Sequence, residues 1–224
     1  SEMCIRDRAE KIKASNEKII DVLGTVVEYR NLESGEHIKR VKGFTRILAE
    51  KAAKKYPEYN LTPERINIIV AASALHDIGK ITIKDSVLLK PGRLDKDEFE
   101  YMKSHTVRGC DILDQIDGAW DSEYAKVSYA ICRHHHERYD GKGYPDGLTG
   151  EAIPIEAQLV SVADVYDALV SERVYKEAID KDKAYHMILM GECGVFSPKL
   201  MECFRESKEE FENLALKYEN ARKE

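Results

Sequence analysis

Apolar residues recur every three or four positions through most of this chain, which is the spacing of helices that each bury one face. The first such stretch spans residues 16–30. A second spans residues 38–52 and stops before Pro57, whose ring cannot continue a helix. No stretch alternates apolar and polar residues with the period of two that a half-buried strand requires. The pattern therefore predicts an all-α protein of about seven helices.

The third predicted helix is the most apolar segment of the chain. It begins with Thr62 as N-cap and Pro63 at the first helical position, then continues through IIVAASAL to the letters HDIG. A helix that is apolar on every side is typical of the centre of a domain. We therefore expect His76 and Asp77 to lie at the end of the best-buried helix.

The downstream half predicts further helices on either side of one long loop. Asp95 and Glu98 have the spacing of a capping box, which begins a helix that runs on to His105, and another helix covers residues 122–136. The segment DGKGYPDGLTGEAIP holds four glycines and two prolines in fifteen residues, so it predicts tight turns. Later helices are predicted over residues 159–170, 183–190 and 198–218, the last capped by Ser197.

Composition narrows the possible functions. With 224 residues and 43% hydrophobic content, the chain can build the core of one domain. A net charge of -6 offers no broad basic surface for duplex nucleic acid. No apolar run could span a bilayer and no signal-peptide pattern is present, so we expect a cytoplasmic protein without membrane contact. The five cysteines never form a C-x-x-C pair, which argues against disulfides and a zinc ribbon.

The same patterns divide the chain into segments. Residues 1–8, SEMCIRDR, carry no helical period, and we interpret them as a non-native scar. We assign residues 9–32 to an N-terminal amphipathic or linker helix. Residues 33–218 would form one domain that carries the chemistry, and residues 219–224 a polar tail.

Imidazole and carboxylate side chains are concentrated in the middle of the chain. They are Glu33, His37, His76, Asp77, His105, His135, His136 and Asp164. Such groups bind divalent metals without thiolate, and eight of them exceed what one ion can use. An aspartate that bridges two ions would hold them about 3.5–4 Å apart. A His-Asp pair alone is more simply a capped helix end, but the whole set favours a metal-dependent hydrolase.

Six motifs follow one another along the chain. They are HIKRV, LHDIGK, KSHTVRG, HHERYDGKGYPDGLTGEAIP, VADVYDAL and RVYK. Together they resemble the HD-GYP domain, a metal-dependent branch of the HD phosphohydrolase superfamily, over about residues 19–211. The resemblance implies a bacterial signalling enzyme. It would hydrolyse cyclic di-GMP to pGpG, or onward to GMP, by a metal-activated hydroxide.

The resemblance also implies metal ligands. The older, single-metal site of the superfamily would use His37, His76, Asp77 and Asp164. A second ion would use His105, His135 and His136, with Asp77 as the bridge, and Glu33 would accompany a third ion. Ligands that are all nitrogen or oxygen favour iron or manganese. Two or three divalent ions outweigh three carboxylates, so the pocket would be positive toward a phosphodiester.

Residues outside the ligand set would contact the substrate. Lys80, close after His76, would act beside Asp77 as a catalytic residue by contacting a phosphate oxygen. Tyr144 would stack on guanine, and Arg173 and Lys176 would bind phosphate or a base edge. This chain departs from the family's RPYK pattern by having a valine where proline is usual, which leaves Arg173 less constrained.

Other polar residues near the motifs have simpler interpretations. His134 lies about 100° around the helix from His135, and His186 lies in no motif, so neither is expected to bind metal. Asp167 is expected to cap or brace a helix. Three charged residues follow His136 in the chain, Glu137, Arg138 and Asp140. They could either orient the imidazole ligands or brace the loop through salt bridges.

Two other functions stay open at this point. The domain could bind a cyclic dinucleotide or a partner protein without turnover, although the complete ligand set argues for catalysis. It could also hydrolyse a mixed guanine-adenine dinucleotide, because the motifs specify the phosphate site better than the base pocket. We further expect an upstream sensor or receiver domain, joined through the first helix, and a homodimer.

Overall fold

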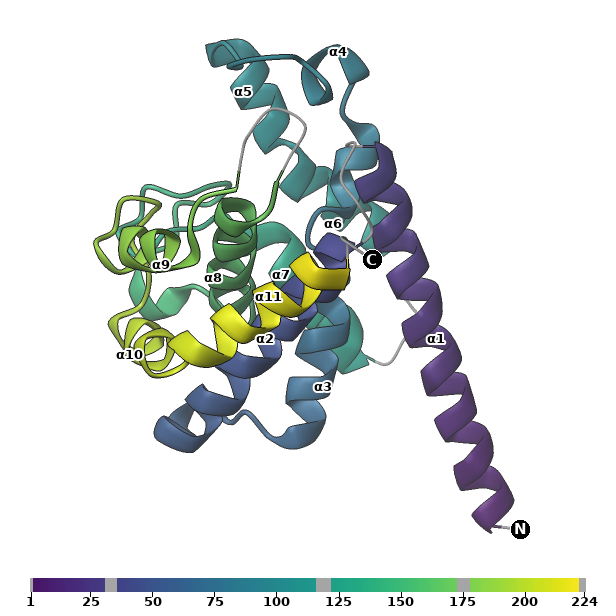
Figure 1. Ribbon diagram of the computed structural model, residues 1–224. Coiled ribbons are helices and arrows are strands. Elements are labelled where there is room, and N and C mark those ends of the chain that lie inside the picture. The colour runs from purple at the N-terminus through teal and green to yellow at the C-terminus, as the bar shows by residue number, and fades with distance from the viewer. Residues whose placement is uncertain (1, 31–35, 116–121, 173–177, 222–224) are drawn as a thin grey trace.

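The computed structural model describes residues 2–30, 36–115, 122–172 and 178–221, and these ranges are mostly helical (Figure 1). They contain eleven α-helices and four short 3-10 helices. No strand occurs within the described ranges, where only an isolated bridge joins Asp140 and Thr149. The expected all-α class is confirmed. The helices outnumber the predicted seven partly because three of the predicted helices are broken.

The α-helices have the following bounds: α1 (Glu2–Arg30), α2 (Glu36–Lys55), α3 (Pro63–Ala72), α4 (Asp85–Leu88), α5 (Lys96–Lys103), α6 (His105–Asp114), α7 (Ser122–His134), α8 (Ile155–Val170), α9 (Lys181–Leu189), α10 (Pro198–Glu206) and α11 (Lys208–Ala221). The 3-10 helices are η1 (Pro57–Tyr59), η2 (Ser73–Leu75), η3 (Ile78–Thr82) and η4 (Gly150–Ala152). None of the helices so described is both long and apolar enough to cross a membrane.

The main core forms where α2, α8 and α11 meet. Phe44 of α2 stacks on Phe211 of α11 with 4.8 Å between ring centroids, and meets Tyr166 of α8 edge-on at 5.0 Å. All three rings are fully buried, and each buried aromatic ring contributes about 1.5–3 kcal/mol of transfer free energy. Figure 1 shows α11 lying across α2. This packing sets α2 against α8 although 127 residues separate His37 from Asp164.

Helix α1 runs along the side of the domain and extends beyond it at its N-terminal end (Figure 1). Gly24 lies so close to the Ala74 carbonyl that an added Cβ would stand 2.4 Å from its oxygen. At the end of α1, the Arg30 guanidinium donates hydrogen bonds to the backbone oxygens of Lys80 (3.0 Å), Ile81 (2.6 Å) and Ile83 (2.6 Å). The helix is therefore fixed to the segment that carries the HDIGK motif.

The central apolar helix ends earlier than the sequence predicts. Thr62 caps α3 as expected, accepting a hydrogen bond from the Arg65 N–H, but α3 stops at Ala72. The hydroxyl of Ser73 donates to the Val70 carbonyl at 2.8 Å, and the chain tightens into η2. A side chain that bonds to the preceding turn competes with the regular helix. His76 and Asp77 thus lie in a turn between η2 and η3, and not at the end of an α-helix.

Two other predicted helices are also broken. The capping box of Asp95 and Glu98 is confirmed, but α5 ends at Lys103, and His105 is the first residue of α6. The helix predicted from Pro198 to near Tyr218 is divided into α10 and α11 at Ser207. Ser197 occupies the N-cap position of α10, but its side chain makes no capping hydrogen bond.

Candidate metal centre

Five segments that are distant in sequence bring the candidate ligands together. His37 lies in the first turn of α2, His105 begins α6, and Asp164 lies in the middle of α8. His76 and Asp77 come from the turn between η2 and η3, and His135 and His136 follow the end of α7. All are buried except His136 and Asp164, which are partly exposed. The predicted ligand Glu33 lies outside the described residues.

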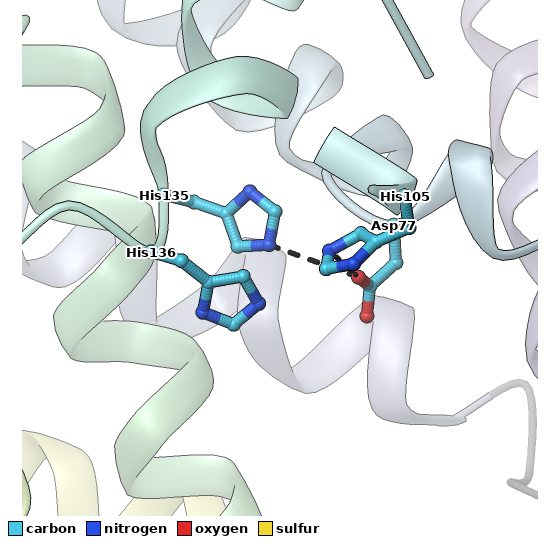
Figure 2. A group of neighbouring side chains, drawn as sticks. All are labelled: Asp77, His105, His135 and His136. Carbon is cyan, nitrogen blue, oxygen red and sulfur yellow. Dashed lines mark ion pairs between the residues drawn. The ribbon is translucent and has the colours of Figure 1, made fainter. Parts of the chain in front are cut away.

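The ligands fall into two groups within which one ligand atom per residue lies less than 4.8 Å from the others. One group is His37, His76 and Asp164, and the other is Asp77, His105, His135 and His136. Figure 2 shows the second group, in which the imidazoles and the Asp77 carboxylate converge on one space. The grouping agrees with the division into two metal sites that the sequence predicts.

Asp77 stands between the two groups. Its Oδ2 lies 3.2 Å from His76 Nε2, whereas its Oδ1 lies 3.2 Å from His105 Nε2 and 3.7 Å from His135 Nε2. One carboxylate oxygen therefore faces each group of imidazoles. A carboxylate that offers one oxygen to each of two ions is the usual bridge in two-metal sites.

Hydrogen bonds fix which nitrogen of each imidazole faces the site. The Nδ1 atoms of His76, His105 and His135 lie 2.8, 2.8 and 3.0 Å from the backbone carbonyls of Ser73, Met102 and Ile131. A carbonyl can only accept, so Nδ1 carries a hydrogen and Nε2 is the nitrogen that faces the site. These three Nε2 atoms and Asp77 Oδ1 are buried without a hydrogen-bond partner. Orphaned buried nitrogen and oxygen atoms with this arrangement fit divalent metal ions.

His37 is held by a carboxylate instead. Its Nδ1 donates to Asp167 Oδ2 at 2.7 Å, and Arg40 donates from Nε to Asp167 Oδ1 at 2.5 Å and from a terminal nitrogen to Oδ2 at 3.0 Å. Asp167 is fully buried. The prediction that Asp167 braces a helix is confirmed, and the brace acts on a candidate ligand. Arg40 and Asp167 each follow a candidate ligand by three residues, which places them on its side of the helix, but this spacing does not show that the two helices pack together.

The carboxylates set the charge of the site. Burial lowers the pKa of His76, but the charges of Asp77 and Asp164 raise it by more, to about 10. Burial likewise opposes ionisation of Asp77, but the neighbouring Lys80 and His76 keep its pKa well below the ordinary value. Glu28, a buried residue of α1 that the sequence reasoning missed, adds negative charge that raises the pKa of His37 and His76. This half of the site favours positive charge, which a metal ion would supply.

In the opposite half of the site, His135 and His136 favour the neutral form of the imidazole. Burial is the largest cause that lowers the pKa of His135 and of His136, and neighbouring imidazoles lower both further. A neutral imidazole is the form that ligates metal. His136 is also stacked on Tyr144, with ring centroids 4.7 Å apart and planes at 28°.

Lys80 contacts the Asp77 carboxylate directly. Its Nζ lies 2.5 Å from Asp77 Oδ2, the oxygen that also faces His76. The predicted contact between Lys80 and a phosphate oxygen stays a prediction. Tyr144 is placed at the edge of the metal site, as expected for a residue of the glycine-rich loop, whereas Arg173, Val174 and Lys176 lie outside the described residues.

The polar residues after His136 hold the glycine-rich loop in place. Glu137 accepts hydrogen bonds from the backbone N–H groups of Asp146, Gly147 and Leu148 at 2.7–3.0 Å. Arg138 forms a two-point salt bridge with Asp140. These contacts support the loop-bracing alternative, and none of them reaches an imidazole ligand. At Gly143, an added Cβ would lie 2.3 Å from the Arg138 nitrogen, so the fold requires glycine there.

The two remaining histidines are not placed as ligands of the main site. His134 lies with Glu137 and Asp146 in a third group of potential ligands. Glu137 is already occupied by three N–H donors, and Asp146 forms a two-point salt bridge with Arg133, so this group is poorly suited to a cation. His186 is exposed on α9, where its Nδ1 bonds to the Asp182 carbonyl.

Comparisons with known proteins agree with this geometry. The family model of the HD domain matches residues 10–192. A cyclic di-GMP phosphodiesterase of Vibrio cholerae is 40% identical over 214 residues, which cover 94% of this chain and 43% of that protein. A 3'3'-cGAMP-specific phosphodiesterase of the same species is 34% identical over 200 residues, covering 89% of this chain and 36% of that protein. The chain thus spans less than half the length of these two relatives.

A solved structure extends the likeness to the fold. An HDG"Y"P protein from Bdellovibrio bacteriovorus superposes with a TM-score of 0.56 at 19% sequence identity. The superposition covers 88% of this chain and 67% of that one. At this identity the likeness concerns the helical architecture alone.

Proposed function

Because this chain belongs to the HD domain family and carries the HD-GYP motifs, we propose that it is a metal-dependent phosphodiesterase that hydrolyses cyclic di-GMP to pGpG or, after a second cleavage, to GMP. The observation that carries the proposal is the position of Asp77, with one oxygen toward His76 and the other toward His105 and His135. Such a bridge suits two-metal hydrolysis of a phosphodiester.

The proposed cofactors are two or three divalent ions, with iron or manganese favoured by the nitrogen and oxygen ligands. His37, His76 and Asp164 would hold one ion, and His105, His135 and His136 another, with Asp77 shared. Glu33 would accompany a third. When bound, such ions supply positive charge for phosphoryl oxygens and activate a water molecule as nucleophile.

The protein's own residues would orient the substrate around these ions. Lys80, whose ammonium lies at the Asp77 carboxylate, would contact a phosphoryl oxygen as a point charge. Tyr144 would contact a base, and Arg173 and Lys176 would bind phosphate or a base edge. The backbone hydrogen bonds at Nδ1 keep the imidazoles from rotating as the substrate enters.

The test compares two adjacent histidines. The protein is purified without oxygen, loaded with iron or with manganese, and incubated with cyclic di-GMP, and the products are separated by chromatography. We expect turnover by the wild type and by His134→Ala, whereas His135→Ala should lose both turnover and metal. Absence of turnover with either metal in the wild type would refute the phosphodiesterase.

A second substrate has specific support. One relative, at 34% identity, is named for its specificity for 3'3'-cGAMP, so a mixed guanine-adenine dinucleotide is the alternative substrate. Parallel assays with both dinucleotides at equal concentration decide between them. A regulatory module that binds without turnover is the remaining alternative, and it predicts tight binding with the ligand recovered unchanged.

The segment boundaries and partners are part of the same proposal. We assign catalysis to residues 33–218. To residues 9–32, most of which lie in α1, we assign the role of a linker from an upstream sensor or receiver domain and of a contact with a second copy. The exposed apolar residues Ile19, Val22, Val26 and Tyr29 recur on α1 at the three- and four-residue intervals of a coiled-coil seam. Sedimentation of the wild type and of Val22→Lys tests the dimer, because the charge should dissociate it. A wild-type monomer would contradict it.

A further inference from the structure

An exposed aromatic ring lies close to the metal site. Phe99 of α5 has 47% of its surface exposed, and no residue of α5 is buried. Its ring lies edge-on to Tyr144, with centroids 6.3 Å apart and planes at 81°. Tyr144 in turn stacks on His136, one of the candidate metal ligands. Two ring contacts therefore connect Phe99 to the metal centre.

A cation lies beside both rings. Lys103, the last residue of α5, places its Nζ 5.3 Å from the centroid of Phe99 and 5.6 Å from that of Tyr144. The ammonium is also paired with the exposed Glu100 at 2.7 Å. Cation–π contacts hold the lysine side chain against the aromatic surface. One ammonium, shared with the Glu100 carboxylate, thus lies next to an exposed ring.

A single exposed apolar side chain is ordinary on a protein surface and by itself indicates nothing. Phe99 differs because its ring does not serve the core and because its neighbours are Tyr144 and the Lys103 ammonium. An exposed aromatic face with an adjacent cation suits an aromatic base attached to a phosphate, since bases stack on aromatic rings and the cation attracts the anion.

We propose that Phe99, Lys103 and Tyr144 form a base-binding wall, on which Phe99 stacks against a purine base of the dinucleotide whose scissile phosphate lies at the metal centre. Lys103 lies against the phosphate-bearing side of that base and attracts the substrate's negative charge. The inference rests on the proposed function in one respect, since it takes the metal centre as the phosphate site. It goes further by assigning Phe99 and Lys103, on a helix that carries no metal ligand, to substrate binding.

Kinetics of the metal-loaded protein test the wall. Base stacking contributes about 1–3 kcal/mol, so Phe99→Leu should raise the KM for cyclic di-GMP by about 5- to 150-fold. The kcat, the metal content and the inhibition constant of inorganic phosphate, which has no base, should stay unchanged. Phe99→Trp, which keeps an aromatic ring, should keep the wild-type KM. The control is Leu216→Ala, at a residue of α11 that is 42% exposed, and it should also leave the KM unchanged.

A second pair of variants tests the Lys103 ammonium. Lys103→Gln should raise the KM several-fold and weaken its dependence on salt, whereas Lys96→Gln at the exposed start of α5 should not. A wild-type KM in both Phe99→Leu and Lys103→Gln would overturn the wall and leave the phosphodiesterase standing.

Equilibrium binding separates the two proposals if the wild type shows no turnover. The metal-loaded protein is titrated with cyclic di-GMP, and Phe99→Leu should weaken binding by the same factor that is expected for KM. That result would support the wall and refute catalysis. Equal affinities, or no binding of a purine dinucleotide by the wild type, would overturn the wall.

Discussion

Asp77 places its Oδ1 3.2 Å from His105 Nε2, across the gap between the η2–η3 turn and the start of α6. Its second oxygen faces the other way, toward His76. The two groups of imidazoles therefore share a carboxylate, and the site is best regarded as one unit whose halves depend on Asp77. That dependence leads to the first prediction.

Asp77→Ala should remove both metal and activity, because each half of the site loses a ligand at once. Lys80→Ala should keep its metal and lower kcat by about 10²-fold, because it removes a cation that acts on the transition state and not a ligand. Elemental analysis of protein purified without oxygen, together with turnover of cyclic di-GMP, provides the measurement. Full metal content in Asp77→Ala would show that Asp77 does not bridge.

Asp167→Asn should weaken metal binding at the His37 half of the site. The amide cannot carry the negative charge that holds the His37 imidazole, and loss of such a carboxylate typically costs 10- to 100-fold in metal affinity. The buried Arg40 also loses the closer of its two charged partners, so the free energy of unfolding should fall by about 3–5 kcal/mol.

Metal stoichiometry distinguishes a local effect from general destabilisation in the Asp167 variant. We expect one ion fewer per chain at limiting metal, with the ions bound near His105 retained. Asp182→Asn, which removes an exposed carboxylate paired with Lys208, is the matched control and should keep the wild-type stoichiometry. An unchanged metal count and affinity in Asp167→Asn would show that the brace is purely structural.

Metal binding should release a proton from His76. Without metal, its pKa is raised to about 10, so the imidazole is protonated at pH 7.5, and ligation requires the neutral form. Because the proton competes with the metal, the metal affinity should rise with pH up to about pH 10. Calorimetric titrations in two buffers of different ionisation enthalpy measure the release, and identical heats would contradict it.

The same shift has a consequence for the metal-free protein. A raised pKa means that protonated His76 stabilises the fold, fully so below the unfolded-state pKa of about 6.5. This stability is lost as the pH rises toward 10. Thermal unfolding of metal-free wild type and of His76→Gln across this range should converge at the alkaline end. Parallel curves would show that another group is responsible.

Gly79→Ala should displace His105. An added Cβ would stand 1.8 Å from the His105 carbonyl oxygen and 2.6 Å from the Gly109 nitrogen, and neither backbone atom can move alone. We expect a loss of about 1–3 kcal/mol in unfolding free energy and a lower metal content. Ile81→Ala, which trims an exposed side chain two residues later, should change neither. Wild-type metal content in Gly79→Ala would argue against a tight η3–α6 contact.

Much of the candidate centre could be predicted from sequence because its candidate ligands occur in short motifs. The two groups that contain Asp77 and Asp164 are those that the HD-GYP resemblance implies. What the sequence did not reveal depends on contacts between distant segments. Arg40 meets Asp167 only because α2 packs on α8, and no local pattern reports that packing. Ser73 and Ser104 lie where two predicted helices end early, and their hydroxyls donate to carbonyls of the preceding turn. The spacing of apolar residues does not predict these hydrogen bonds.

The hydrogen bonds from Arg30 to the backbone oxygens of Lys80, Ile81 and Ile83 join α1 to the η3 segment, so the two are expected to move together. Each bond is worth about 1 kcal/mol, so separating the two costs more than thermal energy supplies. A rotation or displacement of α1 would therefore be transmitted to the backbone at Lys80, three residues from Asp77. Strain on this helix would change the spacing between the two halves of the site without any ligand being replaced.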